Sequence, residues 1–358
     1  MIRFIKREDI KKGTELKIRA VAIILALLLA AIFLIFLNFN PISVFAAMFK
    51  GAFGSPRRIG ETIEKAIPIL IAALGCGVAF KMKYWNIGGE GQILMGAVGA
   101  TFFALNFSNL PSIILIPIMM LAGILCGGLW ALITGVLKVR FNTNETIMTL
   151  MMNYVALKLV TYLQFQRWKD PSAKGMPKIA SFEKSAILPE VFGIHIGWII
   201  AVGLVVAYYF FMKHSKKGYE IAVLGESENT AKYAGINITK TVLFAVFLSG
   251  AICGIAGVIQ ASAVSQTLST QVTGNAGNTA IIVSWLANLS GPVIVVASIL
   301  FAALVEGGSY IQTAFGIPDA AASVIQALIL FFVLGSEFFA RYKLVFTKKQ
   351  QLKEEVAK

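Results

Sequence analysis

The residues of this 358-residue chain that could do chemistry are polar side chains set inside or beside strongly apolar segments. The stretch KYWNIGGEGQ, residues 83–92, places Asn86, Glu90 and Gln92 at the head of an apolar, glycine-rich segment. Amide side chains donate and accept hydrogen bonds, and a carboxylate adds a negative charge. These residues could gate a path for a polar solute. Alternatively they start a helix, with Asn86 as the N-cap and Glu90 favoured by the positive helix end.

A second polar set lies in the stretch FNTNETIMTLMMNY, residues 141–154. Thr146, Thr149 and Asn153 recur at i, i+3 and i+7, which places them on one face of an otherwise apolar helix. We expect this face to line a solute path, with hydrogen bonding between helices as the alternative.

Lys158 and Glu306 are the two charged residues that lie deep within long apolar segments. Ionisable residues inside a membrane are costly and generally serve a function with a partner. We therefore hypothesise that the two side chains approach one another or line the same cavity. For Lys158, snorkelling of the ammonium group to the outer interface is an equal alternative.

Signatures of covalent chemistry are absent from the sequence. The chain has only two histidines, His195 and His214, and contains no GxxxxGK[ST], HExxH or GxSxG motif. Its three cysteines, Cys76, Cys126 and Cys253, all fall in apolar segments and indicate neither a disulfide framework nor a metal site. We expect no enzymatic activity in this chain, and any ATP would be bound by another subunit.

The elements that carry these residues are predicted to be membrane-spanning helices. Apolar residues make up 57% of the chain, against about 45–50% in soluble domains even with glycine counted. The apolar runs are continuous rather than alternating, which favours helices over a barrel. The motifs Gly123-x-x-x-Gly127 and Gly250-x-x-x-Gly254 predict close helix packing. The fold class is therefore an all-α integral membrane protein, a polytopic helical bundle.

About ten spans are predicted from the length of the apolar runs. They are expected at residues 20–39, 66–80, 88–107, 111–137, 146–165, 194–212, 241–263, 276–290, 291–310 and 320–340. The first is interpreted as a retained span, because its apolar run is longer than that of a signal peptide and no cleavage site follows. The pair divided at Gly291-Pro292 could instead be one re-entrant segment and one span.

The distribution of basic residues predicts the orientation of the chain. With the N-terminus inside, 22 of the 32 Lys and Arg residues fall in cytoplasmic segments and nine in external ones. Both termini are therefore expected in the cytoplasm, and the net charge of +14 reflects membrane orientation rather than a nucleic-acid partner. The expected organisation is a basic N-terminal segment 1–19, a membrane domain 20–340 and a cytoplasmic tail 341–358, with the long loop 166–194 outside.

A second long loop, residues 213–240, is expected in the cytoplasm and contains a short polar helix. Ser227 is the predicted N-cap, Glu228 and Lys232 form an i, i+4 pair, and Gly235 ends the helix. Long structured loops often carry function, so this helix is predicted to dock a cytoplasmic partner. The alternative is a solvated connector.

Three stretches in this order, WNIGGEGQ, FNTNETIMTLMMNY and GESENTAKYAGI, resemble permease subunits of bacterial ATP-binding cassette importers. The resemblance covers residues 61–341 and lies in the branch that handles sugars, branched amino acids and nucleosides. It is closest to the longer permease of nucleoside, or "simple sugar", uptake systems. The chain departs from the family at residues 274–292, where it reads GNAGNTAIIVSWLANLSGP and relatives carry an aromatic, glycine-rich run. From the resemblance, a nucleoside is the first choice of substrate, and a ribose-like sugar, riboflavin or another small polar solute is the alternative.

The resemblance implies roles and partners for this chain. The helix in the 213–240 loop corresponds to the coupling helix that sits in a cleft of the ATPase. The residues assigned to coupling are Glu226, Ser227, Glu228, Ala231, Tyr233 and Gly235. The residues expected along the translocation pathway are Asn86, Glu90, Gln92, Thr146, Thr149, Asn153 and Glu306.

The implied partners are a cytoplasmic ATPase, an extracytoplasmic binding protein or lipoprotein, and a second, similar permease that makes the pore a heterodimer. No cofactor is expected on this chain, because the ATPase would use the ATP and Mg. Membrane lipid would surround the chain, which is expected to be a multi-pass protein of the bacterial cytoplasmic membrane. The alternative is a secondary transporter driven by an ion gradient, with Lys158, Glu90 and Glu306 as the ion relay.

Overall fold

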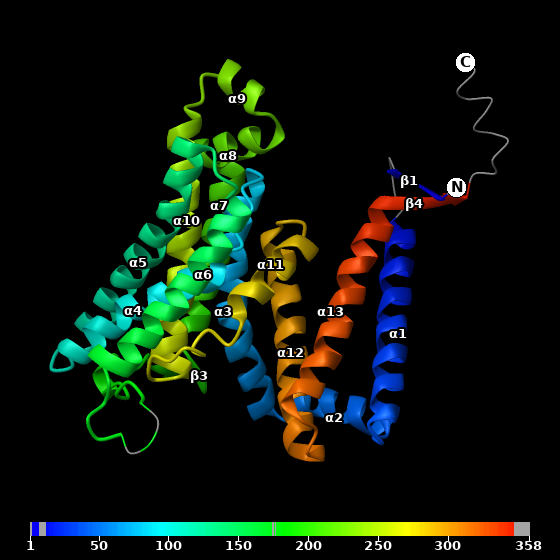
Figure 1. The fold of residues 1–358 in the computed structure, drawn as a ribbon, viewed down its shortest axis with the longest axis horizontal. Coiled ribbons are helices and arrows are strands. Elements are labelled where there is room, and N and C mark those ends of the chain that lie inside the picture. The colour runs from blue at the N-terminus through cyan, green and yellow to red at the C-terminus, as the bar shows by residue number, and fades with distance from the viewer. Residues whose placement is uncertain (1, 7–11, 174, 176, 347–358) are drawn as a thin grey trace. The chain divides into compact units, whose positions relative to one another are not determined.

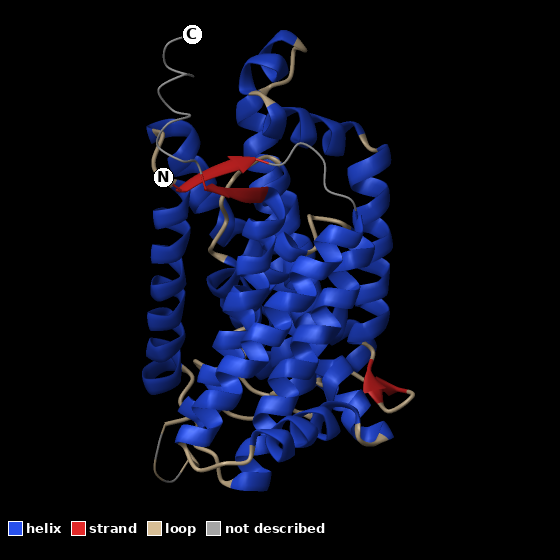
Figure 2. Ribbon diagram, turned by 90° about the vertical axis from the view of Figure 1, so that its right-hand side faces the viewer, coloured by secondary structure: helices blue, strands red, loops and turns tan. Residues whose placement is uncertain are grey.

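A computed structural model describes residues 2–6, 12–173, 175 and 177–346 of the protein, and most of these residues are helical (Figure 1, Figure 2). The chain divides into two compact units. Unit 1 comprises Met1–Ser55 and Leu304–Lys358, and unit 2 comprises Pro56–Ala303.

Unit 2 contains most of the helices. These are α3 (Pro56–Lys81), α4 (Gly89–Asn106), α5 (Ser112–Phe141), α6 (Glu145–Tyr162), α7 (Gly197–His214), α8 (Lys216–Glu226), α9 (Glu228–Tyr233), α10 (Ile238–Ile259), α11 (Ala276–Leu286) and the first half of α12 (Gly291–Phe315). Two π-helical turns extend α6 and α10, namely η1 (Leu163–Arg167) and η3 (Gln260–Val264). The loop between η1 and α7 adds the 3-10 turn η2 (Lys184–Ala186) and the antiparallel pair β2 (Glu190–Val191) and β3 (Ile194–His195).

Glycines bring the backbones of α4, α5 and α10 into direct contact. A methyl group added to Gly254 would overlap the carbonyl oxygen of Gly123, and one added to Gly127 would overlap that of Gly250. Gly96 of α4 lies equally close to Gly254. Small residues that permit such close approach are characteristic of helix pairs in membranes. The predicted packing role of the two glycine motifs is confirmed.

The long loop of unit 2 between η1 and α7, which is predicted to be external, is packed against the protein. The backbone N–H of Phe182 donates to the carbonyl of Gln266 at 2.8 Å, and the Thr267 hydroxyl donates to the carbonyl of Ile179 at 3.1 Å. Ile179 and Phe182 are buried in the same apolar cluster as Leu268. The loop therefore holds the segment that follows α10.

Unit 1 contains α1 (Lys12–Phe36), α2 (Pro41–Phe53), the second half of α12 and α13 (Asp319–Arg341). Between Ala20–Phe36 and Pro41–Phe53 the helix axis bends by 116°. Asn40 caps α2, since its side chain accepts hydrogen bonds from the backbone of Ile42 and Ser43. Strand β1 (Ile2–Lys6) pairs antiparallel with β4 (Tyr342–Phe346), so both ends of the described chain lie at the same end of unit 1.

Each of the ten predicted spans coincides with a helix, but the lengths differ from the prediction. Among the described residues, six helices are long and apolar enough to cross a membrane: α3, α5, α6 with η1, α7, α10 with η3, and α12. A seventh is possible if the bent pair α1 and α2 is one span. The span count and the side of the membrane on which the termini lie remain predictions.

Three features differ from the expectation. Helix α2 was not predicted, because its 13 residues are too few to be recognised as a span. Helix α3 begins ten residues earlier than expected and includes a charged first turn. Helix α11 has 11 residues and is about 16 Å long, half of a hydrocarbon core of about 30 Å. Residues 276–310 therefore form one short helix and the start of one span-length helix.

Candidate functional site

The chain leaves helical geometry between α3 and α4, at residues 82–88. Lys83 adopts a left-handed conformation there, with φ of 59°. Backbone N–H and C=O groups that lack helical partners and are buried away from water must find partners within the protein. Four of the polar residues predicted to line the pathway bond to this first break or lie within it: Asn86, Gln92, Thr149 and Asn153.

The polar stripe on α6 faces the first break. The hydroxyl of Thr149 accepts a hydrogen bond from the backbone N–H of Ile87 at 3.2 Å. The side chain of Asn153 donates to the Ile87 carbonyl at 2.9 Å and accepts from the Gly91 N–H at 2.8 Å. Thr146, on the same face, is half-buried. Hydrogen bonding between elements, the alternative weighed for this stripe, is thus present at two of its three members.

Asn86 is completely buried and is the centre of a side-chain network. Its amide nitrogen donates to the hydroxyl of Ser249 on α10 at 2.9 Å and to the side-chain oxygen of Gln92 at 3.1 Å. Gln92 donates back to the Asn86 oxygen at 2.9 Å. Asn86 also accepts from the N–H of Gly88, which is itself the N-cap position of α4. The interpretation of Asn86 as the N-cap is therefore wrong: it closes a turn just before the helix.

A second break separates η3 from α11, at residues 265–275. Gln266, Gly274 and Asn275 have left-handed φ values of 50°, 54° and 64°. The side chain of Gln260 donates to the carbonyl of Val272 at 3.0 Å, which holds this segment against α10.

Glu90 joins the two breaks. One carboxylate oxygen accepts a hydrogen bond from the N–H of Gly277 at 2.9 Å, and the other accepts one from the hydroxyl of Thr273. Gly277 lies in the first turn of α11, where N–H groups lack helical partners and the helix dipole favours negative charge. Glu90 thus serves a helix start, as one alternative held, but chiefly that of α11 rather than that of its own helix.

Stacked aromatic rings hold the other end of α11. The rings of Trp85 and Trp285 stack with centroids 5.0 Å apart, and Phe80 contacts both. Gly277 and Trp285 are eight residues apart, which is about 12 Å along a helix. The segment from Trp85 to Glu90 therefore runs beside α11 over most of its length. Neither the tryptophan pair nor Thr273 was singled out from the sequence.

The predicted cytoplasmic helix is present as α9. Ser227 is its N-cap and accepts a hydrogen bond from the N–H of Thr230 at 3.2 Å. The Glu228 carboxylate and the Lys232 ammonium form an ion pair at 3.0 Å. The chain turns at Gly235 with a φ of +71°. The predicted N-cap at Ser227, the Glu228–Lys232 ion pair and the end of the helix before Gly235 are confirmed.

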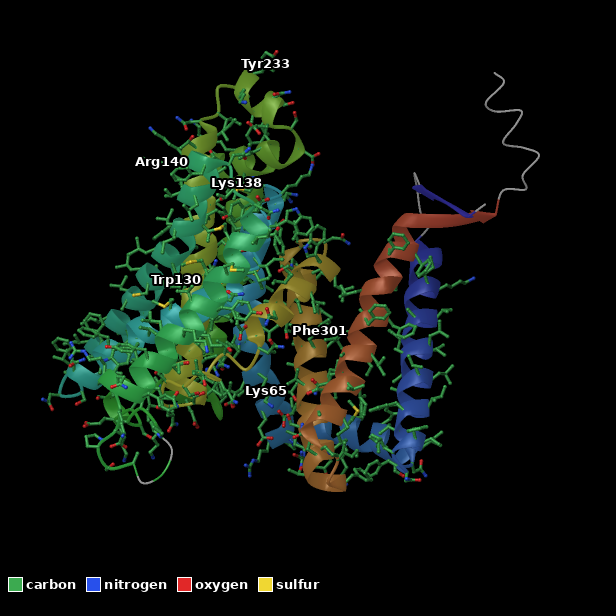
Figure 3. The ribbon with its side chains drawn as sticks, in the orientation of Figure 1. Lys65, Trp130, Lys138, Arg140, Tyr233 and Phe301 are labelled. Atoms are coloured by element: carbon green, nitrogen blue, oxygen red, sulfur yellow. The ribbon has the colours of Figure 1, made fainter. Side chains whose placement is uncertain are left out.

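Helix α9 forms the tip of unit 2, with Tyr233 at its outermost point (Figure 3). The Tyr233 side chain is 94% exposed, whereas Ala231 is completely buried. Glu226 and Glu228 are exposed. A partner that docks here would contact Tyr233 and the two carboxylates, while Ala231 packs inside the unit.

Helix α8 links α9 to the membrane helices. A methyl group added to Gly225 would overlap the carbonyl oxygen of Lys81, the last residue of α3. The Glu220 carboxylate accepts hydrogen bonds from Lys217 at 2.6 Å and from the hydroxyl of Thr241 on α10 at 3.2 Å. The hydrogen bond from Lys217 lowers the pKa of Glu220 below its usual value. Helix α8 is thus fixed to the end of α3, immediately before the first break.

A polar hollow of about 580 Å³ lies between α8–α9 and the ends of α3 and α5. Lys83, Lys138 and Lys232 line it together with Glu145 and Glu228. Lys138 and Glu145 form an ion pair at 2.9 Å. This surface presents both signs of charge beside the exposed tip.

The two deep charges lie in different units. Lys158 is on α6 in unit 2, and Glu306 is on the part of α12 that belongs to unit 1. Their pairing stays a hypothesis.

Comparison with known proteins identifies the family. A family model described as "Branched-chain amino acid transport system / permease component" matches residues 58–334. The chain belongs to this permease family. Three similar proteins cover nearly its whole length. They are a glucose ABC transporter permease of Haloferax volcanii, TsgB13 (32% identical; 90% of this chain and 87% of that one), a guanosine permease of Bacillus subtilis, NupP (29%; 91% and 95%), and a nucleoside permease of Lactococcus lactis, NupB (30%; 90% and 91%).

The permease is therefore the membrane subunit of an ATP-binding cassette importer and is a transport protein, not an enzyme. The system to which such a subunit belongs includes an ATPase, which is a separate subunit, and a substrate-binding protein. Cell-membrane localisation agrees with the six span-length helices among the described residues.

Replacing Glu90 tests the connection between the two breaks. Glu90→Leu leaves the Thr273 hydroxyl and the Gly277 N–H without their acceptor, and each unsatisfied donor costs about 1–3 kcal/mol. Glu90→Gln keeps one acceptor oxygen. We expect thermal stability in detergent and uptake activity to fall in the order wild type, Gln, Leu. Exposed Glu226→Gln, the control, should match wild type in stability. Equal stability of Glu90→Leu and wild type would contradict this role.

Proposed function

We propose that the permease translocates a nucleoside that an extracytoplasmic binding protein delivers. Two of the three relatives are named for guanosine or nucleosides, and each covers at least nine-tenths of the chain. The relative named for glucose makes a sugar the second candidate. Both solutes are uncharged and rich in hydroxyl groups, so either needs a path with neutral polar groups.

The arrangement of Glu90 carries this proposal on the structural side. Its carboxylate is engaged by Thr273 and Gly277, so this acidic side chain is occupied by donors of the protein itself. The side chains that bond to residues 86–91 from within the protein are otherwise neutral amide and hydroxyl groups, those of Gln92, Thr149 and Asn153. Such surroundings suit a neutral solute better than an ion.

The two breaks are proposed to border the translocation pathway. Broken helices at membrane depth are tolerated where they are covered by protein or line a cavity, and transporters place their sites there. In this proposal Asn86, Gln92, Thr149 and Asn153 hold the first break in shape and Glu90 connects it to α11. Thr146 and Glu306 are also proposed to lie along the pathway.

Helix α9 is proposed to be the coupling helix. A partner ATPase that binds Tyr233, Glu226 and Glu228 would move α8. Gly225 of α8 contacts Lys81 at the end of α3. Because the first break follows α3 directly, that movement would reach Glu90 and then α11. Closure of the ATPase would thereby open the path to one side of the membrane at a time, as alternating access requires.

A second permease is proposed to complete the pore. The resemblance is to the longer of two different permeases in one system, which favours a heterodimer. The ATP and Mg are used by the ATPase, and no cofactor is assigned to this chain.

Substrate identity is tested by competition in cells that express the permease with its ATPase and binding protein. Uptake of labelled guanosine should be suppressed by excess unlabelled nucleosides but not by glucose or ribose. Cells without this permease provide the background. Uptake of labelled glucose that guanosine does not affect would replace the nucleoside by the sugar.

Docking of the ATPase is tested by Tyr233→Asp, which places a charge at the exposed tip without disturbing packing. We expect the ATPase to co-purify with the wild-type permease in mild detergent and to be recovered at least tenfold less with the variant. Phe192→Asp is the matched control, since Phe192 is 91% exposed in the β2–β3 turn at the opposite end of unit 2 (Figure 1). Unchanged ATPase recovery with Tyr233→Asp would contradict docking through α9.

A further inference from the structure

An apolar groove runs between α1 and α13 within unit 1. It has a volume of about 440 Å³, and nearly all of its lining is apolar. Its walls include Val21 and Leu25 of α1 and Phe331 and Phe339 of α13. These four side chains are between 47% and 71% exposed, so the groove is open to its surroundings.

Small residues create the groove. Ala22 lies on the α1 side and Gly335 on the α13 side. A Cβ atom added to Gly335 would meet no heavy atom within 4 Å. The space opposite Gly335 is therefore unfilled by the protein, although the two helices pack against each other around it.

A basic residue lies at one end of the groove, where the sequence is rich in Lys and Arg. Lys17 lines the groove at the end where α1 begins and α13 ends. The pairing of β1 with β4 brings the first and last described segments to this end. Within residues 2–6, 12–19 and 337–346, seven positions are basic and two are acidic. The basic positions are Arg3, Lys6, Lys12, Lys17, Arg19, Arg341 and Lys343.

We propose that this groove binds one acyl chain of an anionic glycerophospholipid, with the lipid phosphate held at Lys17. The lining from Lys17 to Leu25 spans eight residues, about 12 Å, which is close to the roughly 15 Å depth of one leaflet of hydrocarbon. Clusters of Lys and Arg beside a membrane helix attract anionic lipid headgroups. An apolar groove that ends in such a cluster matches both parts of the lipid.

The size of the groove argues against a protein occupant. A helix with its side chains is about 10–12 Å in diameter. A groove of about 440 Å³ would therefore hold only about one turn of such a helix. Its volume lies instead in the range of small-molecule sites, about 300–1,000 Å³. A single lipid chain is the occupant that fits the shape, the apolar lining and the charge together.

The test is lipid titration of the purified, delipidated full-length permease, followed by native mass spectrometry. The probes are phosphatidylglycerol and phosphatidylcholine with identical acyl chains. Wild type should bind one phosphatidylglycerol at least fivefold more tightly than phosphatidylcholine. Lys17→Gln should weaken phosphatidylglycerol binding about fivefold, the effect of one basic residue at a membrane surface. It should weaken phosphatidylcholine binding less, because the choline group offsets the phosphate charge.

Filling the groove provides the second arm. Gly335→Leu should lower binding of phosphatidylglycerol at least tenfold, because the added side chain occupies the space of the lipid chain. Gly203→Leu on α7 is the matched control, since Gly203 also has no heavy atom within 4 Å of an added Cβ, and it should bind lipid like wild type. Equal binding of the two lipids by wild type, or unchanged binding by Gly335→Leu, would overturn the proposal. If Gly335→Leu does not fold, as judged by thermal unfolding, the Lys17→Gln variant alone tests the lipid site, because Lys17 is exposed and its replacement should not affect folding.

Discussion

The structure of this permease depends on satisfying backbone polar groups where its helices are interrupted. Where an interruption is buried, no water supplies hydrogen-bond partners, so groups of the protein must complete it. The first break takes partners from Thr149 and Asn153, and the network of Asn86, Gln92 and Ser249 holds its shape. The carboxylate of Glu90 then ties this break to the start of α11. Asn86, Glu90, Gln92, Thr149 and Asn153 are thus accounted for by the geometry they maintain.

A rigid frame surrounds these breaks. Backbones of α4, α5 and α10 touch at glycines, which leaves no space for relative sliding without loss of contact. The short helix α11, in contrast, is held at its two ends by Glu90 and by the stacked tryptophans. A frame of close-packed helices beside a short, end-anchored helix provides both a fixed part and a part that a coupling movement could displace.

The sequence predicted the features that have local causes. Continuous apolar runs located the helices, and the Ser227, Glu228 and Gly235 pattern located α9, because caps and i, i+4 pairs involve neighbours in the chain. The partners of Glu90 lie more than 180 residues away, and nothing local indicates them. Helix α2 was not predicted because its 13 residues make about two-thirds of a span. The β1–β4 pair was not predicted because it joins segments from the two ends of the sequence.

In the proposed mechanism, ATP hydrolysis by the partner ATPase drives solute through this chain, and α8 and α9 transmit the movement. The most direct measurement is uptake into proteoliposomes that contain the permease, its partner permease and ATPase, with the binding protein outside. The account predicts uptake that requires ATP and Mg on the ATPase side and persists when ionophores collapse proton and sodium gradients. Uptake driven by an ion gradient without ATP would contradict it, and Glu90, Lys158 and Glu306 would then be examined as an ion relay.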